Sequence, residues 1–324
     1  MSVGALMQYL SGLPFNAILS ATAELDLAEV LAGGPLEVSE VASRCGAQAD
    51  AIGRLLRALA VLGLVARTDD ERYASTPALA FLRTGGDGSL RALALLHAQP
   101  PIQAAWQRFA DAIRTGTTGF QLAHGRPFFD HLDAHDGLRE LFQASLSGPA
   151  AWNAVIAEAG VDLSDRRLAV DVGAGDGRLL GALLDAYPDL QGIAFDRPGV
   201  AARAPLAHPR LTWQGGSFFD AVPAGDVHLL RWVLHDWPDE QAVAVLRRCR
   251  EASAAGGLLL VLENLLDTPA GAGAALLDVS MMVFTGGRER TGAEYASLLE
   301  RGGWRLERSI PTTAGLSVLT AGAA

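Results

Sequence analysis

The sequence of 324 residues predicts an α/β protein in which a mostly helical N-terminal part precedes a parallel, doubly wound sheet. Three observations predict this class. Apolar residues recur at helical spacing before about residue 165, for example over 51–64, 90–96 and 138–159. After that point, short β-like runs alternate with amphipathic helical stretches, and a glycine-rich turn follows the first run directly.

Composition excludes several classes of protein and chemistry. The net charge is −10, and a duplex nucleic acid would require a dense cationic face instead. No lysine occurs, which excludes Schiff-base chemistry and phosphate loops of the Walker type. Cys45 and Cys249 cannot form a disulfide framework or a zinc site by themselves. With no run of about 20 apolar residues and no secretory signal at the start, we expect a reducing, cytoplasmic location.

Within the helical part, residues 36–73 have the pattern of a winged helix. A short helix capped by Ser39, a second helix with an apolar face and a small β wing are expected in that order. Five arginines face six carboxylates in this segment, and no basic stripe appears. A structural or dimerising winged helix is therefore favoured over a DNA-binding one.

Five short apolar runs are expected to form the strands of the sheet. Their alternation with helical stretches is typical of a parallel sheet covered on both faces. The expected strands are 168–172, 192–195, 226–230, 258–262 and 317–320.

The most informative segment is the turn after the first expected strand. Asp171 opens a G-x-G-x-G turn that contains Gly173 and Gly175 and runs directly into a helix. Such glycines allow close approach of a ligand, and the acidic residue suits a cationic ligand better than a pyrophosphate. Asp196 ends the next strand, where a carboxylate can accept both hydroxyl groups of a ribose. These features favour a ligand that carries an adenosyl group and an amino-acid ammonium group, such as S-adenosylmethionine.

At this point the sequence resembles the bacterial and plant S-adenosylmethionine-dependent O-methyltransferases that act on small aromatic molecules. The motifs that carry the resemblance span nearly the whole chain: GRPFF at 125–129, DVGAGDG at 171–177, FDRP at 195–198, GGSFFD at 215–220, RWVLHDW at 231–237, LENLLD at 262–267 and GGRERT at 286–291. The resemblance implies a winged-helix-like dimerisation domain over 1–100, a helical linker and substrate-pocket region over 101–160, and a Rossmann-like class I methyltransferase domain over 161–324. It also implies a homodimer interlocked through its N-terminal helices.

The resemblance implies that His235 is the general base, oriented by Glu263 and Glu289. A neutral phenol is a poor nucleophile, and a base with a pKa near 6.5 can take its proton at neutral pH. A carboxylate that holds one ring nitrogen fixes the tautomer and stabilises the imidazolium ion that forms. For Glu289, a salt bridge to Arg288 or Arg290 is the competing interpretation.

Two positions at the expected cofactor site depart from the family pattern. Ser217 stands where the family has an aspartate that accepts a hydrogen bond from the adenine, while Phe218 still offers a face for the ring. Arg231 replaces the usual lysine, which keeps the charge but changes its geometry. The cofactor remains S-adenosylmethionine, with about tenfold weaker binding expected from the lost charged acceptor.

For the aromatic substrate, the resemblance points to Phe142, Leu146, Asp236 and Met281. Aromatic and methionine side chains can hold a planar ring in a dry pocket. We assign no metal, because the histidines His131 and His135 are better explained as an exposed polar helix face.

Two alternatives to O-methylation stay open. One is a methyltransferase-like enzyme that uses the same cofactor for hydroxylation, decarboxylation or a pericyclic step. The other is a ligand-sensing winged-helix regulator, which the acidic wing disfavours.

Overall fold

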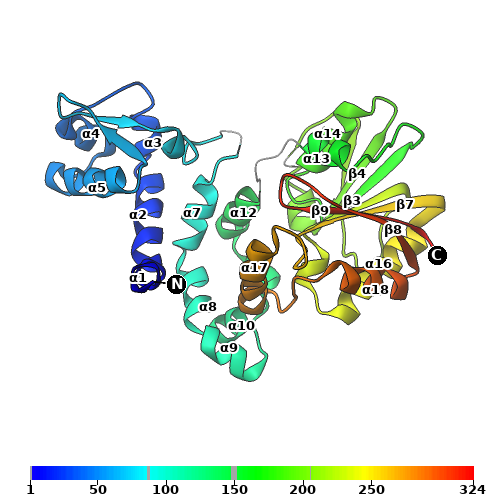
Figure 1. Ribbon diagram of the computed structural model, residues 1–324. Coiled ribbons are helices and arrows are strands. Elements are labelled where there is room, and N and C mark those ends of the chain that lie inside the picture. Colours follow the sequence, from blue (N-terminus) through cyan, green and yellow to red (C-terminus); the bar gives the residue numbers. More distant parts are fainter. Residues whose placement is uncertain (1, 86–87, 147–151, 205) are drawn as a thin grey trace. The chain divides into compact units, whose positions relative to one another are not determined.

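A computed structural model describes residues 2–85, 88–146, 152–204 and 206–324 (Figure 1). The chain divides into two compact units. The first unit comprises residues 1–103 and 135–150, and the second comprises residues 104–134 and 151–324. In the described ranges, no helix is both long and apolar enough to cross a membrane.

The first unit is mainly helical and carries a two-stranded sheet. Its elements are α1 (Val3–Leu10), α2 (Gly12–Glu24), α3 (Leu27–Val30), α4 (Val38–Cys45), α5 (Ala49–Val61), β1 (Val65–Arg67), β2 (Tyr73–Ser75), α6 (Pro77–Ala80), α7 (Arg91–His97) and α12 (Asp136–Ser145).

The expected winged helix is present in this unit. Strands β1 and β2 pair antiparallel and form the wing after α4 and α5. Leu56 and Leu59 are fully buried in the core of the unit, as the apolar face of the second helix requires. The prediction of a Ser39 cap is wrong, because α4 begins at Val38 and its N-cap is Glu37, which makes no side-chain cap bond.

Helix α1 has no buried residue in the single chain. Its apolar side chains are largely exposed, and so is one at the start of α2: Val3, Leu6, Met7, Tyr9, Leu10 and Leu13. Such a continuous apolar surface on a helix indicates a face that another polypeptide covers.

The second unit contains the large sheet and the helices around it. Its elements are α8 (Pro100–Gln107, which begins just before the unit's first residue), α9 (Phe109–Thr115), α10 (Gly119–His124), α11 (Phe128–Ala134), α13 (Trp152–Glu158), β3 (Leu168–Val172), α14 (Arg178–Ala186), β4 (Gln191–Asp196), α15 (Pro198–Ala201), β5 (Leu211–Gly215), β6 (Gly225–Arg231), the 3₁₀ helix η1 (Leu234–Asp236), α16 (Asp239–Ala252), β7 (Ser253–Glu263), α17 (Gly271–Phe284), α18 (Gly292–Arg301), β8 (Trp304–Pro311) and β9 (Ser317–Ala323).

The sheet has seven strands in the order β5-β4-β3-β6-β7-β9-β8. The first five strands in this order are parallel, whereas β9 runs antiparallel to both β7 and β8. Helix α14 packs on β3, β4 and β5, α16 packs on β7, and α18 packs on β8 (Figure 1). This confirms the doubly wound α/β class, with an antiparallel pair added at one edge.

The two strands absent from the sequence prediction are β5 and β8, and both lie at the edges of the sheet. Burial in them is only partial or alternating, so neither shows the continuous apolar run of a central strand. The five expected runs coincide with β3, β4, β6, β7 and β9.

The direction of the strand order reverses at β3, inside the sheet. From β3 the chain moves to β4 and β5 on one side, and then returns to β6 on the other side. In open parallel sheets, ligands bind at the carboxyl ends of the strands where the order reverses in this way. Asp171 lies at this end of β3, Asp196 ends β4, Arg231 ends β6 and Glu263 ends β7. These candidate residues thus all lie at the carboxyl ends of the parallel strands.

Candidate active site

The glycine-rich turn after β3 has the backbone conformation that only glycine adopts without strain. Gly173, Gly175 and Gly177 all have positive φ angles, of 77°, 59° and 76°. A Cβ atom at Gly173 would lie 2.7 Å from Val233, so a side chain there would also clash with the segment after β6. The turn then passes into α14, with Gly177 as its N-cap.

Asp196 ties the end of β4 to this turn. Its Oδ2 accepts a hydrogen bond from Gly175 N–H at 2.7 Å, and its Oδ1 accepts one from Arg197 N–H at 2.7 Å. The carboxylate is therefore fixed by two backbone donors at the carboxyl ends of neighbouring strands.

Both cofactor-side acids are costly to ionise where they lie. Burial raises the pKa of Asp171 to about 7, although the charge of Arg231 counteracts it. Burial also raises the pKa of Asp196 to about 6, against the two backbone hydrogen bonds and the charge of Arg197. A cation or hydroxyl donor bound here would stabilise the charged forms.

Arg231 lies between the glycine-rich turn and two tryptophans. Its guanidinium carbon is 4.8 Å from the ring centroid of Trp152 and 5.1 Å from that of Trp232. The side chain is buried, and its Nη2 is the nearest atom to a Cβ built at Gly175, at 3.7 Å. A planar guanidinium suits such stacking better than an ammonium group, which gives a physical reason for arginine at this position.

Ser217 and Phe218 lie in the turn after β5. Ser217 is exposed, and its Oγ accepts a hydrogen bond from Phe219 N–H at 3.2 Å. Phe218 is partly buried and packs edge-on against Phe219 and Trp237. Trp237 thereby connects this turn to the segment that carries His235.

Glu263 organises the short 3₁₀ helix η1, which carries His235. Its Oε1 accepts hydrogen bonds from the N–H groups of Val233, Leu234 and His235 at 3.2, 3.0 and 3.3 Å. A carboxylate at the N-terminus of a helical turn satisfies donors that have no partner within the turn. Glu263 therefore positions the backbone of His235, while its Oε2 lies 3.7 Å from His235 Nδ1.

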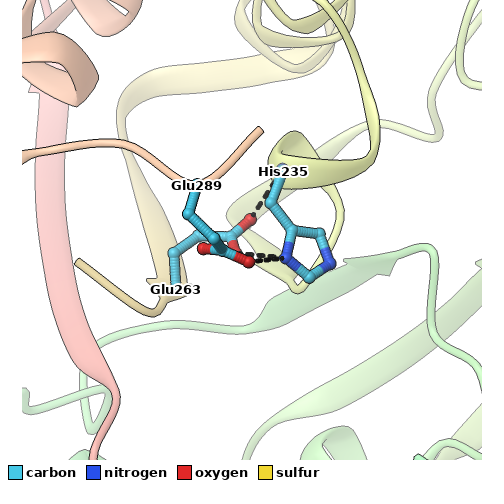
Figure 2. Close-up of side chains that lie close together, drawn as sticks. All are labelled: His235, Glu263 and Glu289. Atoms are coloured by element: carbon cyan, nitrogen blue, oxygen red, sulfur yellow. Dashed lines mark hydrogen bonds and ion pairs between the residues drawn. The ribbon is translucent and has the colours of Figure 1, made fainter. Parts of the chain in front are cut away.

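Glu289 binds the imidazole itself. Its Oε1 lies 2.6 Å from His235 Nδ1, and both side chains are buried (Figure 2). This contact requires the proton to be on Nδ1, so Nε2 faces away from the two glutamates. In the sequence interpretation, a salt bridge from Glu289 to Arg288 or Arg290 competed with this contact. Among the described residues, Glu289 pairs with His235, and Arg290 pairs with Asp239 at 2.8 Å.

The carboxylates strongly favour the imidazolium form of His235. Burial alone would lower its pKa, but the charges of Glu263 and Asp236 and the bond to Glu289 outweigh burial and raise it to about 10. Burial raises the pKa of Glu263 to about 7 against the attraction of His235, and raises that of Asp236 to about 6. The cluster is built to accept and hold one proton on its histidine.

Arg290, expected only as a possible partner of Glu289, and Gly287, which the sequence did not single out, hold this loop in place. Arg290 is fully buried and donates from Nη1 to Leu234 O at 3.1 Å and from Nη2 to Trp237 O at 2.8 Å. A Cβ atom at Gly287 would lie 2.0 Å from His235 O, so only glycine permits this backbone approach. Both residues belong to GGRERT, and their place in that motif close to Glu289 was the available signal.

A metal ion would find possible ligands at the same cluster. His235, Glu263 and Glu289 offer ligand atoms that lie within 4.8 Å of one another. The 2.6 Å contact between Nδ1 and Oε1 is, however, the length of a charge-assisted hydrogen bond, and hard cations prefer sites made of oxygen ligands alone. The arrangement therefore fits a proton between histidine and glutamate better than a metal ion.

The histidine pair noted in the sequence does not share a helix face. His131 lies in α11 and is buried against Phe120 and His124, with ring centroids 5.1 Å away from each. His135 is exposed and forms the N-cap of α12. The prediction of one exposed polar helix face is wrong, because His131 is buried and the helix ends at Ala134, before His135.

The four substrate candidates fall in different units. Met281 is buried in α17, and its Sδ lies 3.5 Å from Thr285 Oγ1. Asp236 Oδ1 lies 3.8 Å from His235 Nε2. Phe142 and Leu146 are half-buried at the end of α12 in the first unit. Contact with a substrate stays a prediction for all four.

Family models match both parts of the chain. Residues 7–84 match the O-methyltransferase dimerisation domain, and residues 106–305 match the O-methyltransferase domain. The chain therefore belongs to the O-methyltransferase family and is an S-adenosylmethionine-dependent O-methyltransferase.

Individual relatives agree with this assignment over nearly the full length. The chain is 35% identical to the phenazine O-methyltransferase PhzM of Lysobacter antibioticus, over 98% of this chain and 95% of that protein. It is 33% identical to the 8-amino-8-demethylriboflavin N,N-dimethyltransferase of Streptomyces davaonensis, over 92% and 89%. Among solved structures, the O-methyltransferase NcsB1 from neocarzinostatin biosynthesis, in complex with S-adenosylmethionine and 2-hydroxy-5-methyl naphthoic acid, has a TM-score of 0.79 at 32% identity, covering 98% of each chain.

Proposed function

We propose that this protein transfers a methyl group from S-adenosylmethionine to a hydroxyl group of a small aromatic or polyketide-type natural product, with His235 as general base. The observation that carries the proposal is the 2.6 Å contact between His235 Nδ1 and Glu289 Oε1. It fixes the ring so that Nε2 can accept a proton.

The residues at the edge of the sheet fit the cofactor. Asp171 would bind the ammonium group of the amino-acid tail, Asp196 would bind the ribose, and Gly173 and Gly175 would allow close approach of the backbone. Ser217, Phe218 and Arg231 would complete the site. The raised pKa values of Asp171 and Asp196 support this, because a bound cation or hydroxyl donor would stabilise the charged form of each buried carboxylate. The bound cofactor supplies a methyl group on a positively charged sulfur.

His235 is proposed to remove the proton of the acceptor hydroxyl through Nε2. In the unprotonated ring, donation from Nδ1–H to Glu289 holds the tautomer in which Nε2 has a free lone pair. The share of this unprotonated form increases with pH, because the carboxylates raise the pKa of His235 to about 10. As the proton arrives, the charges of Glu289 and Glu263 stabilise the imidazolium ion. Burial excludes water from this exchange and strengthens the electrostatic stabilisation.

The acceptor is proposed to be planar and hydroxylated. In the second unit, Asp236 and Met281 are its proposed contacts, and contact with Phe142 and Leu146 of the first unit stays a separate prediction. The names of the relatives support a planar acceptor, since phenazine and naphthoic acid are aromatic. The riboflavin dimethyltransferase among them adds an aromatic amine as a second acceptor class. A hydroxyl is favoured here, because a neutral amine already carries its nucleophilic lone pair and needs less help from a base such as His235.

Mass spectrometry tests the reaction. Purified protein is incubated with methyl-labelled S-adenosylmethionine and a library of phenols and aromatic amines. A gain of one labelled methyl group on a phenol is expected. Product without the label, altered by hydroxylation or loss of carbon dioxide, would instead support the alternative in which the cofactor serves a non-methylating reaction.

The protein is proposed to work as an obligate homodimer through a dimerisation domain over residues 1–100. The exposed apolar residues of α1 and the match to a dimerisation domain support this. Analytical ultracentrifugation at micromolar concentration is expected to show a dimer. Replacing Leu6 and Leu10 by glutamate is expected to give an inactive monomer, and a stable, fully active monomer would contradict the proposal.

A further inference from the structure

Arg197 follows Asp196 directly, and its side chain joins the end of β4 to α11. Its Nη2 lies 3.3 Å from Asp130 Oδ1 and also forms an ion pair with Asp133 Oδ2. Asp130 and Asp133 are three residues apart in one helix, so both carboxylates lie on the same face of α11. One guanidinium group therefore bridges two carboxylates of the helix.

An aromatic contact continues from Arg197 to the catalytic loop. The guanidinium carbon lies 5.9 Å from the ring centroid of Phe129, and Phe129 stacks on Trp237 with centroids 5.9 Å apart and an angle of 25° between the rings. Trp237 in turn packs edge-on against Phe218. Helix α11 thus contacts the segments that carry the proposed ribose and base residues, and Trp237 extends this contact to the turn that carries Phe218.

The ion pairs are partly exposed, so each contributes little by itself. The exposed fractions of the side chains are 34% for Arg197, 60% for Asp130 and 42% for Asp133. What they provide together is a restraint, because a planar guanidinium that is bridged and stacked has few remaining orientations. The backbone N–H of the same residue holds Asp196 Oδ1, so restraining Arg197 also restrains the carboxylate.

We propose that Arg197 is a positioning residue for the cofactor site: it anchors α11 to the turn that carries Asp196 and so keeps that carboxylate oriented towards the ribose. The proposal rests on the proposed function, in which Asp196 binds the ribose. It assigns a role to the FDRP motif and to the acidic residues of α11 together.

Calorimetric titration with S-adenosylhomocysteine tests the proposal on the full-length protein. Arg197→Leu is expected to weaken binding by about tenfold, and Arg197→Lys is expected to recover part of the loss because it keeps one ion pair. The double variant Asp130→Asn/Asp133→Asn is expected to weaken binding by ~3–5-fold. Adding Arg197→Leu to it is expected to cost less than Arg197→Leu costs alone, since all three residues act through one contact.

The acidic pair separates positioning from a simple effect of charge. Asp133 opposes ionisation of Asp196, so a purely electrostatic role of Arg197 would make Asp130→Asn/Asp133→Asn bind at least as tightly as the unmodified protein. That result would overturn the proposal. Because the double variant leaves Arg197 in place, it also carries the test if Arg197→Leu does not fold.

Two further variants serve as controls. Arg301→Leu removes a comparably exposed arginine, which pairs with Glu240, and is expected to leave binding unchanged. Asp196→Ala is expected to weaken binding strongly. If Asp196→Ala weakens binding and Arg197→Leu does not, the positioning role is overturned while the proposed function stands. If Asp196→Ala binds normally, the ribose assignment itself fails.

Discussion

Two groups of buried acids lie on the side of the sheet where the parallel strands end, and they differ in the positive charges that surround them. The cofactor-side acids are Asp171 and Asp196, and burial raises their pKa values to about 7 and about 6. The base cluster is His235 with Glu263 and Glu289, and it contains its own cation, because its carboxylates raise the pKa of His235 to about 10. Asp171, Asp196 and Glu263 lie at the carboxyl ends of parallel strands, and His235 follows the end of β6.

The difference shows which part of the site is complete without a ligand. The base cluster contains its own cation, and Glu263 and Glu289 bind the backbone of η1 and the imidazole, so the fold itself sets its geometry. At the cofactor-side acids, the charges of Arg231 and Arg197 only partly offset burial, so we expect a bound cation or hydroxyl donor to stabilise the charged forms. Substitutions of the acids in the two groups should therefore change the stability of the protein in opposite directions.

The largest effect is expected from His235→Ala. Turnover of a phenol at pH 7 should fall by about 10²–10⁴-fold, because the proton acceptor is lost, while affinity for S-adenosylhomocysteine stays nearly unchanged. The loss should shrink as the pH approaches the phenol's own pKa near 10, since the acceptor then ionises without help. Steady-state kinetics and calorimetry measure both. A loss that is the same at every pH would remove the role of general base.

A smaller effect on binding, with a gain in stability, is expected from Asp171→Asn. S-adenosylhomocysteine should bind ~10–100-fold more weakly, because a charge-assisted contact to the ammonium group is lost. The ligand-free protein should be more stable at pH 8, with Tm higher by ~2–4 °C, because a buried charge is removed.

The pH dependence of this gain follows from the raised pKa. The cost of the raised pKa is complete above about pH 7, decreases as the pH falls, and disappears only below about pH 3.8, the usual pKa of an aspartate, where the group is protonated in the folded and the unfolded protein. The gain from Asp171→Asn should therefore be clearly smaller at pH 5 than at pH 8. Asp185→Asn, an exposed change on α14, is the control. A lower Tm at pH 8 would contradict the comparison.

The opposite stability change is expected from Glu263→Gln in the base cluster. The amide is a weaker acceptor for the three N–H groups of η1, and His235 loses a counter-charge. We expect a loss of about 2 kcal/mol in the free energy of unfolding, measured by denaturant titration. Glu300→Gln, at an exposed position of α18, should change it by less than about 0.5 kcal/mol. A neutral or stabilising Glu263→Gln would mean that the charge of Glu263 does not stabilise η1 and His235.

Much of the cofactor side of the candidate site could be predicted from local sequence. The turn around Gly173 and Gly175 is contiguous with its strand and helix, so its fold follows from a short pattern. Central strands β3 and β7 were evident as apolar runs, because both faces of the sheet are covered there. The edge strands β5 and β8 lacked this signal, since they are only partly buried.

Which of the two glutamates binds the backbone and which binds the imidazole could not be predicted from sequence. The resemblance implied that both flank the imidazole, but Glu263 mainly binds the backbone of η1 and Glu289 binds the ring. Which acid takes which donor depends on the approach of Gly287 to the His235 backbone and on the burial of Arg290. These are contacts between segments about 50 residues apart, and no local pattern encodes them.

The carboxylates around His235 are expected to raise its proton affinity, and the pH dependence of kcat/KM tests this most directly. The pH dependence of kcat/KM is recorded for the unmodified protein and for Glu289→Gln with the same phenol. A general base works when unprotonated, so the rate should rise with pH through the pKa of His235, which lies above 6.5. Glu289→Gln should lower the rate by about tenfold and move the rise to lower pH, because a counter-charge is removed. A rise that stays at the same pH in both proteins would contradict the account.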